Sequence, residues 1–398
     1  MEWGAARVLR DRNSGLYLGG VVVSGFGSSA MSLAAGVWVK SLTGSDSLAA
    51  LALFCVWAPT LFGPVIGTLT DRTRRRPLLV RANLAMAALL LTLLTVRTEG
   101  QVWLLFAVLT AYGVSAVLTD AAEAALVASA VPAELHGDFN GLRMTANEGM
   151  KLVAPLLGAG LFVQFGGAAV AVLDAVTFAL AAGAFALMRV SEPPPPRKGA
   201  ARWTARTAEG ARYVWRQRGL RRLVLAGAAT MFVAGLNGAA VYAVVDSGLH
   251  RSPAFAGVLY AAQGVGSVLS GVAAGPLLRR LPERAFAAAG IALFGLGVAL
   301  RTTPSSTVAL AASVLIGAGL PCVLIAAMTA VQRDTPHALL GRVAATANTL
   351  VFAPNAVSLA AGAGLVALLD HRVLLAVAGA LAGATALGLV VRGRPERG

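Results

Sequence analysis

The chain is built almost entirely from long apolar runs separated by short polar segments rich in arginine. A run of about 20 apolar residues is what an α-helix needs to cross the hydrocarbon core of a bilayer. With 57 % hydrophobic and only 13 % charged residues, the chain has more apolar surface than a water-soluble fold of 398 residues could bury. The sequence therefore predicts an all-α membrane protein.

Twelve transmembrane helices are predicted from the apolar runs. They lie near residues 14–39, 47–70, 77–96, 102–126, 140–164, 168–189, 221–245, 253–278, 285–301, 306–331, 341–369 and 372–391. No cleavable signal is expected ahead of the first span, because its apolar stretch is too long for one.

The net charge of +15 could indicate nucleic-acid binding, but the position of the charges argues against it. Lys and Arg lie in short loops between spans, and multi-pass proteins keep such loops on the cytoplasmic side. We therefore expect a protein of the cell (inner, cytoplasmic) membrane, with both termini in the cytoplasm and no nucleic-acid partner. Of the 33 Lys and Arg residues, those assigned to the outer side are Lys40, Arg97, Arg251, Arg301 and Arg372.

A long basic segment divides the chain into two halves. Residues 191–220 are the predicted cytoplasmic loop between an N-terminal six-helix bundle, 1–190, and a C-terminal six-helix bundle, 221–398. Within the loop, Thr207–Arg218 has aromatic residues among its arginines, which favours a short amphipathic helix on an anionic leaflet. A solvated linker that only sets the topology explains these charges as well.

The two halves also repeat short motifs at matching positions. Pro132-Ala-Glu-Leu-His-Gly137 precedes the fifth span, and Pro336-His-Ala-Leu-Leu-Gly341 precedes the eleventh. Ala154-Pro155 and Ala353-Pro354 then follow. Repeats of about half a chain are typical of secondary transporters made of two pseudo-symmetric bundles, with the solute site between them.

The segment from Gly67 to Arg76 reads G-T-L-T-D-R-T-R-R-R. It resembles the signature loop of the major facilitator superfamily, with arginine where the family usually has its second glycine. The resemblance implies two six-helix bundles that work by alternating access. It also implies that Asp71, with Arg72 and Arg75, latches the halves in the outward-facing state. Arg342, at the start of the eleventh span, is an expected partner of Asp71, as is that helix's positive N-terminal end.

Segments 147–165 and Asp174-Ala-Val-Thr-Phe178 look like the proton-linked drug and siderophore exporter branch of that superfamily. Ala154-Pro155-Leu-Leu-Gly158-Ala159 is similar to its antiporter signature, with alanine in place of two glycines. The basic residue that many drug antiporters carry in helix four is absent. The resemblance implies export of a small amphipathic organic compound, such as a drug, antibiotic or siderophore-like metabolite, in exchange for protons.

Charged side chains inside spans are candidates for coupling, because each is costly there unless paired or hydrated. Glu148 and Lys151 lie one helical turn apart in the fifth span, where they form either a switchable or a static ion pair. Asp120 and Glu123 have the same spacing in the fourth span. Two close carboxylates suit proton exchange, although contact with interfacial water or a nearby arginine explains them too. Asp174, in the sixth span, is a weaker candidate.

Amide side chains in the spans are candidates for lining a solute cavity, although hydrogen bonding between helices explains each nearly as well. These residues are Asn147, Asn237, Gln263, Asn348 and Asn355. The two cysteines lie in apolar runs, and no glycine-rich lysine loop is present, so we expect no disulfide, metal site, cofactor or ATP-driven transport.

Two other functions are open on this sequence, and a third is not expected. An importer or facilitator of a small nutrient would share the same fold. A receptor or scaffold with a transporter fold that no longer transports would also share it. An integral-membrane enzyme would need a cluster of His, Asp or Cys at a membrane face, and none is visible, so no enzymatic activity is expected. We expect a monomer whose partners are a small-molecule solute, protons and the lipid bilayer.

Overall fold

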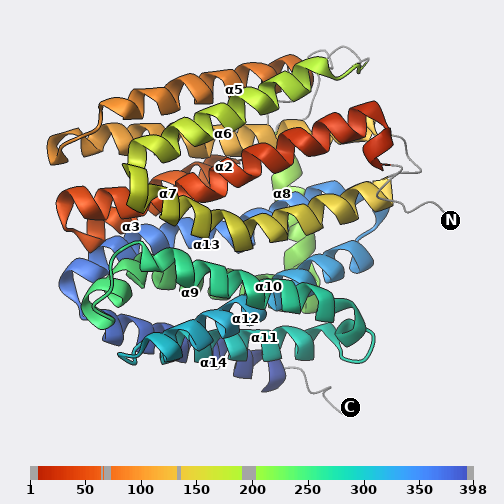
Figure 1. The fold of residues 1–398 in the computed structure, drawn as a ribbon. Coiled ribbons are helices and arrows are strands. Elements are labelled where there is room, and N and C mark those ends of the chain that lie inside the picture. The colour runs from red at the N-terminus through yellow and green to blue at the C-terminus, as the bar shows by residue number, and fades with distance from the viewer. Residues whose placement is uncertain (1–7, 64–65, 67–72, 132–135, 191–202, 392–398) are drawn as a thin grey trace. The chain divides into compact units, whose positions relative to one another are not determined.

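The computed structural model describes residues 8–63, 66, 73–131, 136–190 and 203–391, and these form an all-helical fold (Figure 1). Two compact units emerge from the contacts within the chain. The first contains Met1–Gly44 and Cys55–Gly199, and the second contains Ser45–Phe54 and Ala200–Gly398. The described elements are all helices, which confirms the predicted all-α class. The physical reason is that a backbone surrounded by lipid must satisfy its own hydrogen bonds, as helices do.

The helices divide between the two units as follows. In the first unit they are α2 (Arg12–Thr43), η1 (Ala58–Phe62), α5 (Arg75–Thr92), η2 (Leu93–Thr95), η3 (Glu99–Gln101), α6 (Val102–Ala130) and α7 (His136–Leu187). Helix α3 (Asp46–Trp57) contributes to both units. In the second unit they are α8 (Trp203–Arg216), α9 (Arg218–Ala243), η5 (Val244–Gly248), α10 (Phe255–Leu278), α11 (Glu283–Leu300), α12 (Ser306–Asp334), α13 (His337–Leu368) and α14 (His371–Val391).

Ten helices of the described residues are long and apolar enough to cross a membrane. Two features account for the difference from the predicted twelve. Helix α7 is counted once, although Gly166, with φ 76° and ψ 178°, interrupts it between the predicted fifth and sixth spans. Only glycine adopts that backbone conformation readily. The predicted second span begins as α3 and η1 and continues into residues outside the described part.

Aromatic packing holds the first unit together at the end where α2 begins. The ring of Tyr17 in α2 lies 5.3 Å from Phe139 and 5.9 Å from Phe185, which come from opposite ends of α7. All three side chains are buried, together with Leu79 and Leu126. Tilted and edge-to-face pairs of this kind add about 0.5–1.5 kcal/mol each beyond their buried area.

Small residues allow α2 and α7 to approach closely. A Cβ on Gly158 would lie 2.8 Å from the Ala30 Cα and 2.9 Å from the Ala30 oxygen, both backbone atoms. Ala154 and Ala159, on the same stretch of α7, are buried. The antiporter-like segment therefore serves as a packing surface, which is the usual role of small residues between helices in lipid.

Substitution of Gly158 with alanine is expected to lower the stability of the protein by about 1–3 kcal/mol, because the backbone of α2 must move aside. Gly160→Ala, in the same helix, is the matched control, since a Cβ there meets nothing within 4 Å. Thermal unfolding in detergent measures both. Equal midpoints for the two variants would contradict the close packing.

The second unit uses glycine contacts around α12. A Cβ on Gly317 would lie 1.8 Å from the Gln263 oxygen of α10, and one on Gly319 would lie 2.3 Å from the Gly290 oxygen of α11. Helix α12 therefore touches the backbones of both α10 and α11. The buried apolar core of this unit includes Phe294 of α11 and Leu375 of α14.

The amphipathic segment at the start of the second unit is a helix, as predicted, and part of its apolar side packs against the rest of the unit. The side chain of Val214 in α8 is fully buried, and the Tyr213 hydroxyl donates a 2.5 Å hydrogen bond to the Asp334 carbonyl of α12. Gly210 lies against the backbone of α13, since a Cβ there would be 2.7 Å from the Arg342 oxygen. Trp215, the next residue after Val214, is 51 % exposed, so contact of α8 with a leaflet stays a prediction.

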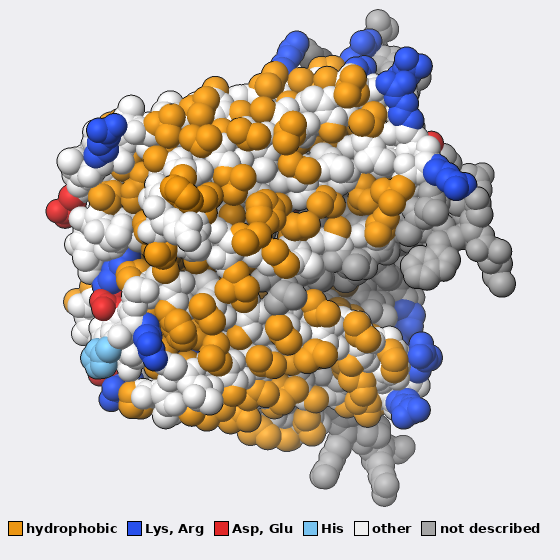
Figure 2. Space-filling model, in the orientation of Figure 1, with side chains coloured by type: hydrophobic (Ala, Val, Ile, Leu, Met, Phe, Trp, Pro, Cys, Tyr) orange, Lys and Arg blue, Asp and Glu red, His pale blue; other side chains and the backbone are white. Residues whose placement is uncertain are grey.

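Hydrophobic side chains cover the middle of the helices, and most of the charged ones gather at helix ends (Figure 2). Large apolar side chains such as Leu180 and Val272 are more than half exposed. A soluble fold rarely exposes so many. In a bilayer the same side chains face lipid.

Candidate functional site

Asp174 of α7 is a fully buried carboxyl group inside a membrane-spanning stretch. Thr177, one turn further along, donates a 3.0 Å hydrogen bond to Oδ1, while Oδ2 has no hydrogen-bond partner in the described residues. The hydroxyl of Tyr112 from α6 lies next to the carboxyl without a well-formed hydrogen bond. Ser28 of α2 is the neighbour of Tyr112. The described groups that face Asp174 are therefore all neutral at pH 7.

The absence of a side chain at Gly27 makes room for this carboxyl group. A Cβ on Gly27 would lie 2.2 Å from the Thr177 hydroxyl and 2.3 Å from Oδ1 of Asp174. Helix α2 thus presents bare backbone to the acid, and no larger residue would fit at this position. Burial without a cation makes the ionised form of a carboxyl group costly, and uptake of a proton removes that cost.

Gly27→Ala is expected to push Asp174 and Thr177 apart and to lower stability by about 1–3 kcal/mol. Gly25→Ala is the control, because it lies in the same helix with nothing within 4 Å of the added Cβ. The measurement is thermal unfolding of both purified variants. A Gly27→Ala protein as stable as Gly25→Ala would mean that the backbone of α2 does not pack tightly against the acid.

The two acids of α6 lie in different surroundings. Asp120 is exposed, whereas Glu123 is 8 % exposed and its Oε2 accepts a 3.0 Å hydrogen bond from the Tyr17 hydroxyl of α2. Glu123 is therefore a second buried acid of the first unit, joined to the aromatic cluster.

Several predicted coupling residues lie outside the described part of the chain. Asp71 and Arg72 fall in the segment 67–72, and the side chains of Asn147, Glu148 and Lys151 are not described. Their roles stay predictions.

The end of the signature loop is described from Thr73 onward. Arg75 is half-buried at the start of α5. Arg76 donates from Nε to the Phe185 carbonyl at 3.1 Å, and from Nη2 to the Ala186 carbonyl. The last arginine of the loop therefore binds the C-terminal end of α7, where the helix dipole favours a cation.

Arg342 has a carboxylate partner in its own unit. Its Nη1 lies 2.5 Å from Oε2 of Glu209 in α8, and both side chains are more than two-fifths exposed. An ion pair this exposed contributes about 1 kcal/mol at most. The predicted contact with Asp71 involves a residue outside the described part, so it stays a prediction.

A buried arginine lies at the C-terminal end of α11. Arg301 is 2 % exposed and donates from Nη1 to Oδ1 of Asn237 in α9, and from Nη2 to the hydroxyl of Ser313 in α12, both at 2.9 Å. Its Nε has no partner, and none of the described carboxylates forms an ion pair with it. The position of Arg301 in the sequence predicts a residue of the outer side, and its burial shows that the guanidinium turns into the bundle.

The remaining amide candidates differ in exposure. Asn355 of α13 is buried, Gln263 of α10 is half-buried, and Asn348 of α13 is exposed. The side-chain oxygen of Asn237 accepts the hydrogen bond from Arg301. No group of three His, Cys, Asp or Glu among the described residues could hold a metal ion.

A sequence model of the Major Facilitator Superfamily matches residues 17–241 and 223–398, which covers both halves of the chain. This chain belongs to the major facilitator superfamily. The resemblance of the loop from Gly67 to Arg76 is thereby confirmed at the level of the superfamily. No curated protein matches the chain significantly.

Solved transporters of this fold superpose on nearly the whole chain. The nucleoside transporter NupG has a TM-score of 0.76 at 10 % identity, with 96 % of this chain and 100 % of the other covered. A bacterial homologue of the iron transporter ferroportin has a TM-score of 0.72 at 17 % identity, with 96 % and 98 % covered. A POT family transporter in complex with 5-aminolevulinic acid has a TM-score of 0.77 at 11 % identity, with 95 % of each chain covered. At these identities the likeness shows the fold alone.

Membership of the superfamily establishes the class of activity. The protein is a multi-pass membrane protein and a secondary transporter of a small-molecule substrate, and the family is non-enzymatic. These neighbours do not single out the drug-exporter branch, so the finer part of that resemblance belongs to a proposal.

Proposed function

We propose that this major facilitator protein is a proton-linked exporter of a small amphipathic organic compound, working by alternating access in the cytoplasmic membrane with both termini inside. The observation that carries the proposal is the buried carboxyl group of Asp174. It lies within a membrane span, and the groups described around it are neutral. A group in such surroundings can take up a proton from one side of the membrane and release it to the other when its surroundings change.

Exchange would link this proton to the solute. Proton uptake at Asp174 from the outer side and solute release to that side would alternate with proton release and solute uptake at the inner side. In this scheme Asp71, Arg72, Arg75 and Arg342 would control access. Glu148 with Lys151, and Asp120 with Glu123, are the other proposed coupling pairs. The resemblance to the exporter branch is the basis for the outward direction.

The proposed amphipathic solute agrees with the small number of polar residues in the spans. Asn147, Gln263, Asn348 and Asn355 would offer hydrogen bonds to its polar groups, among mostly apolar side chains. Asn237 is the exception, because its side-chain oxygen already accepts a hydrogen bond from Arg301.

Proton movement in inside-out vesicles from an efflux-deficient host tests this function. The vesicle lumen is acidified by respiration, antibiotics, dyes and siderophores are added one at a time, and lumenal pH is followed. An exporter of this kind releases lumenal protons on addition of its substrate, and Glu148→Gln and Asp71→Asn reduce the release. Lack of any response from folded protein, together with uptake of a nutrient that ignores the proton gradient, would overturn the proposal in favour of a facilitator or importer.

A further inference from the structure

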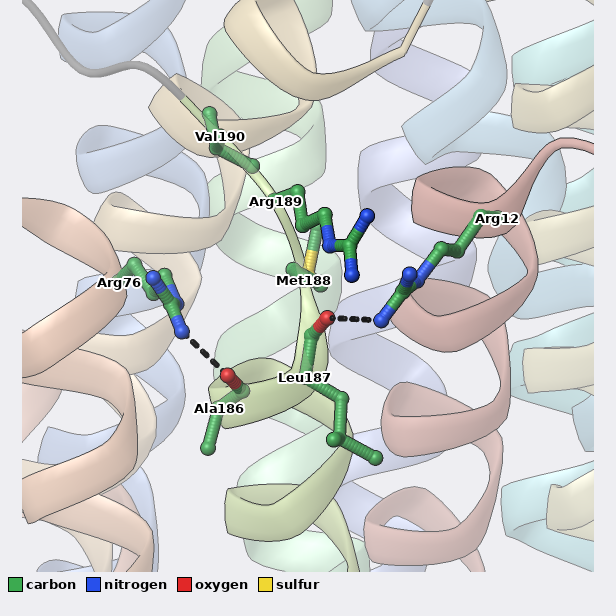
Figure 3. A pocket seen from close by; sticks show the side chains of 7 residues that line it. All are labelled: Arg12, Arg76, Ala186, Leu187, Met188, Arg189 and Val190. Atoms are coloured by element: carbon green, nitrogen blue, oxygen red, sulfur yellow. Dashed lines mark hydrogen bonds between the residues drawn. The ribbon is translucent and has the colours of Figure 1, made fainter.

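Three arginines surround an open hollow of about 570 Å³ at the end of α7 (Figure 3). Arg12 comes from the start of α2, Arg76 from the start of α5, and Arg189 from the chain just after α7. Figure 3 shows Arg189 extending toward Arg12 on one side of the hollow, with Arg76 on the other. Three cations from three separate elements are thus held around one space in the first unit.

Part of this charge caps the helix. Arg12 donates from Nη2 to the Leu187 carbonyl at 3.2 Å. Arg76 donates to the carbonyls of Phe185 and Ala186, the two residues before Leu187. The end of a helix carries only about half a negative charge. Two capping arginines are therefore more than enough for α7, and the third is not needed for it.

The guanidinium of Arg189 makes no hydrogen bond or ion pair with any described residue. Its backbone is nevertheless fixed, because Asn13 of α2 both donates to the Arg189 carbonyl and accepts from the Arg189 N–H, each at 3.0 Å. The side chain is thus held beside Arg12, and no described residue gives it a counter-charge. Like charges brought together repel, and an anion between them would relieve the repulsion.

The acid next to Arg12 in the chain already has hydrogen-bond partners. Asp11 precedes α2, and its Oδ2 accepts from the backbone N–H of Ser14 at 2.8 Å and from the Ser14 hydroxyl at 2.6 Å. It caps α2 and is not among the residues that line the hollow, and the described part of the lining contains no Asp or Glu.

An apolar stripe leads along α7 to the hollow. Val172, Val176, Leu180 and Leu187 lie at helical spacings on one face, with exposed fractions rising from 37 % for Val172 to 58 % for Leu180 and Leu187. Gly183 leaves open space between the last two. Leu187 itself lines the hollow. A lipid-facing surface therefore ends where the arginines begin.

We propose that the hollow binds the phosphate group of an anionic phospholipid, with the acyl chains of the lipid along the α7 stripe. Guanidinium groups match phosphate oxygens in geometry and charge, and they bind them through paired hydrogen bonds. The end of the unit concerned is the one expected to face the cytoplasm, where anionic lipids are enriched. Free phosphate shares the charge, but only a lipid also uses the apolar stripe. The site does not depend on the proposed direction of transport or on proton coupling.

Native mass spectrometry of the full-length protein in detergent tests the site with phosphatidylglycerol as the probe and phosphatidylcholine as the neutral comparison. Wild type is expected to retain phosphatidylglycerol in preference to phosphatidylcholine. Arg189→Gln is expected to weaken retention about fivefold, the loss of one arginine contact near an anionic membrane. Arg189→Lys, which keeps the charge, should fall between the two.

Arg97→Gln is the matched control, because Arg97 is an exposed arginine of the same unit outside the hollow. Unchanged thermal unfolding of Arg189→Gln, whose side chain makes no described bond, would separate lost binding from lost fold. Equal retention by Arg189→Gln and Arg97→Gln overturns the site. Displacement of phosphatidylglycerol by inorganic phosphate at the same phosphate concentration overturns the lipid assignment and indicates a site for free anions.

Discussion

Replacement of Asp174 with asparagine is expected to reduce solute-driven proton release in vesicles to the level of vesicles without the protein. Asparagine has the shape of the acid, and its oxygen can still accept the hydrogen bond from Thr177. It cannot take up a proton at any pH of the experiment. The fold should therefore survive, while the proposed proton carrier is lost.

Two measurements make this result specific. Asp370→Asn removes an exposed acid outside the spans and should leave proton release unchanged. Exchange of labelled solute for unlabelled solute without a proton gradient should continue in Asp174→Asn, because exchange moves no net protons. Loss of that exchange would point to a binding or folding role instead.

Among the described residues, Glu123 is the other buried acid that could act as the proton carrier. Its Oε2 is held by Tyr17, so Glu123→Gln is expected to keep part of the proton release. If Glu123→Gln abolished the release and Asp174→Asn kept it, the proton carrier would be Glu123 and the proposed role of Asp174 would be wrong.

The spans could be predicted from the sequence because lipid imposes a simple requirement. A backbone in hydrocarbon must be helical and must carry an apolar surface, and both conditions are visible as runs of apolar residues. The break between the fifth and sixth spans was also predictable, since it falls at adjacent glycines, and Gly166 adopts the conformation that needs one.

The surroundings of each charged residue could not be predicted in the same way. Asp174 ranked below Glu148 because, from the sequence, it could equally cap a helix or pair with another group near the outer interface. Its burial depends on Gly27 of α2, which is distant in sequence and presents its backbone to the carboxyl. A distance along the chain does not reveal which helix faces a given side chain.

Arginines at helix ends show the same limit. From sequence, Arg301 could extend into water or turn into the bundle, since a long side chain near the interface can do either. In the structure the Arg301 side chain points into the bundle. Its two terminal nitrogens donate hydrogen bonds to Asn237 of α9 and Ser313 of α12. Signals for this existed in the polar residues Asn237 and Ser313, but their alignment with Arg301 depends on how three helices pack.

Asn237→Leu is expected to destabilise the second unit by about 2–3 kcal/mol, because it removes a hydrogen-bond acceptor from a buried charge. Hydrogen bonds between neutral groups in membrane bundles are worth about 0.6 kcal/mol on average. The larger cost here arises because the guanidinium of Arg301 would keep its charge, and its Nε already lacks a partner. Thermal unfolding in detergent measures the loss.

Asn348→Leu is the control for this change, since Asn348 is an exposed amide in the same unit and should tolerate leucine. The comparison also separates two roles for Asn237. If its side chain holds Arg301, the variant loses stability, and Arg301→Met in the same protein restores part of it by removing the stranded charge. If Asn237 instead lines the solute path, Asn237→Leu unfolds like wild type but changes which compounds drive proton release. That pattern would show that the solute, and not Arg301, is the functional partner of the amide.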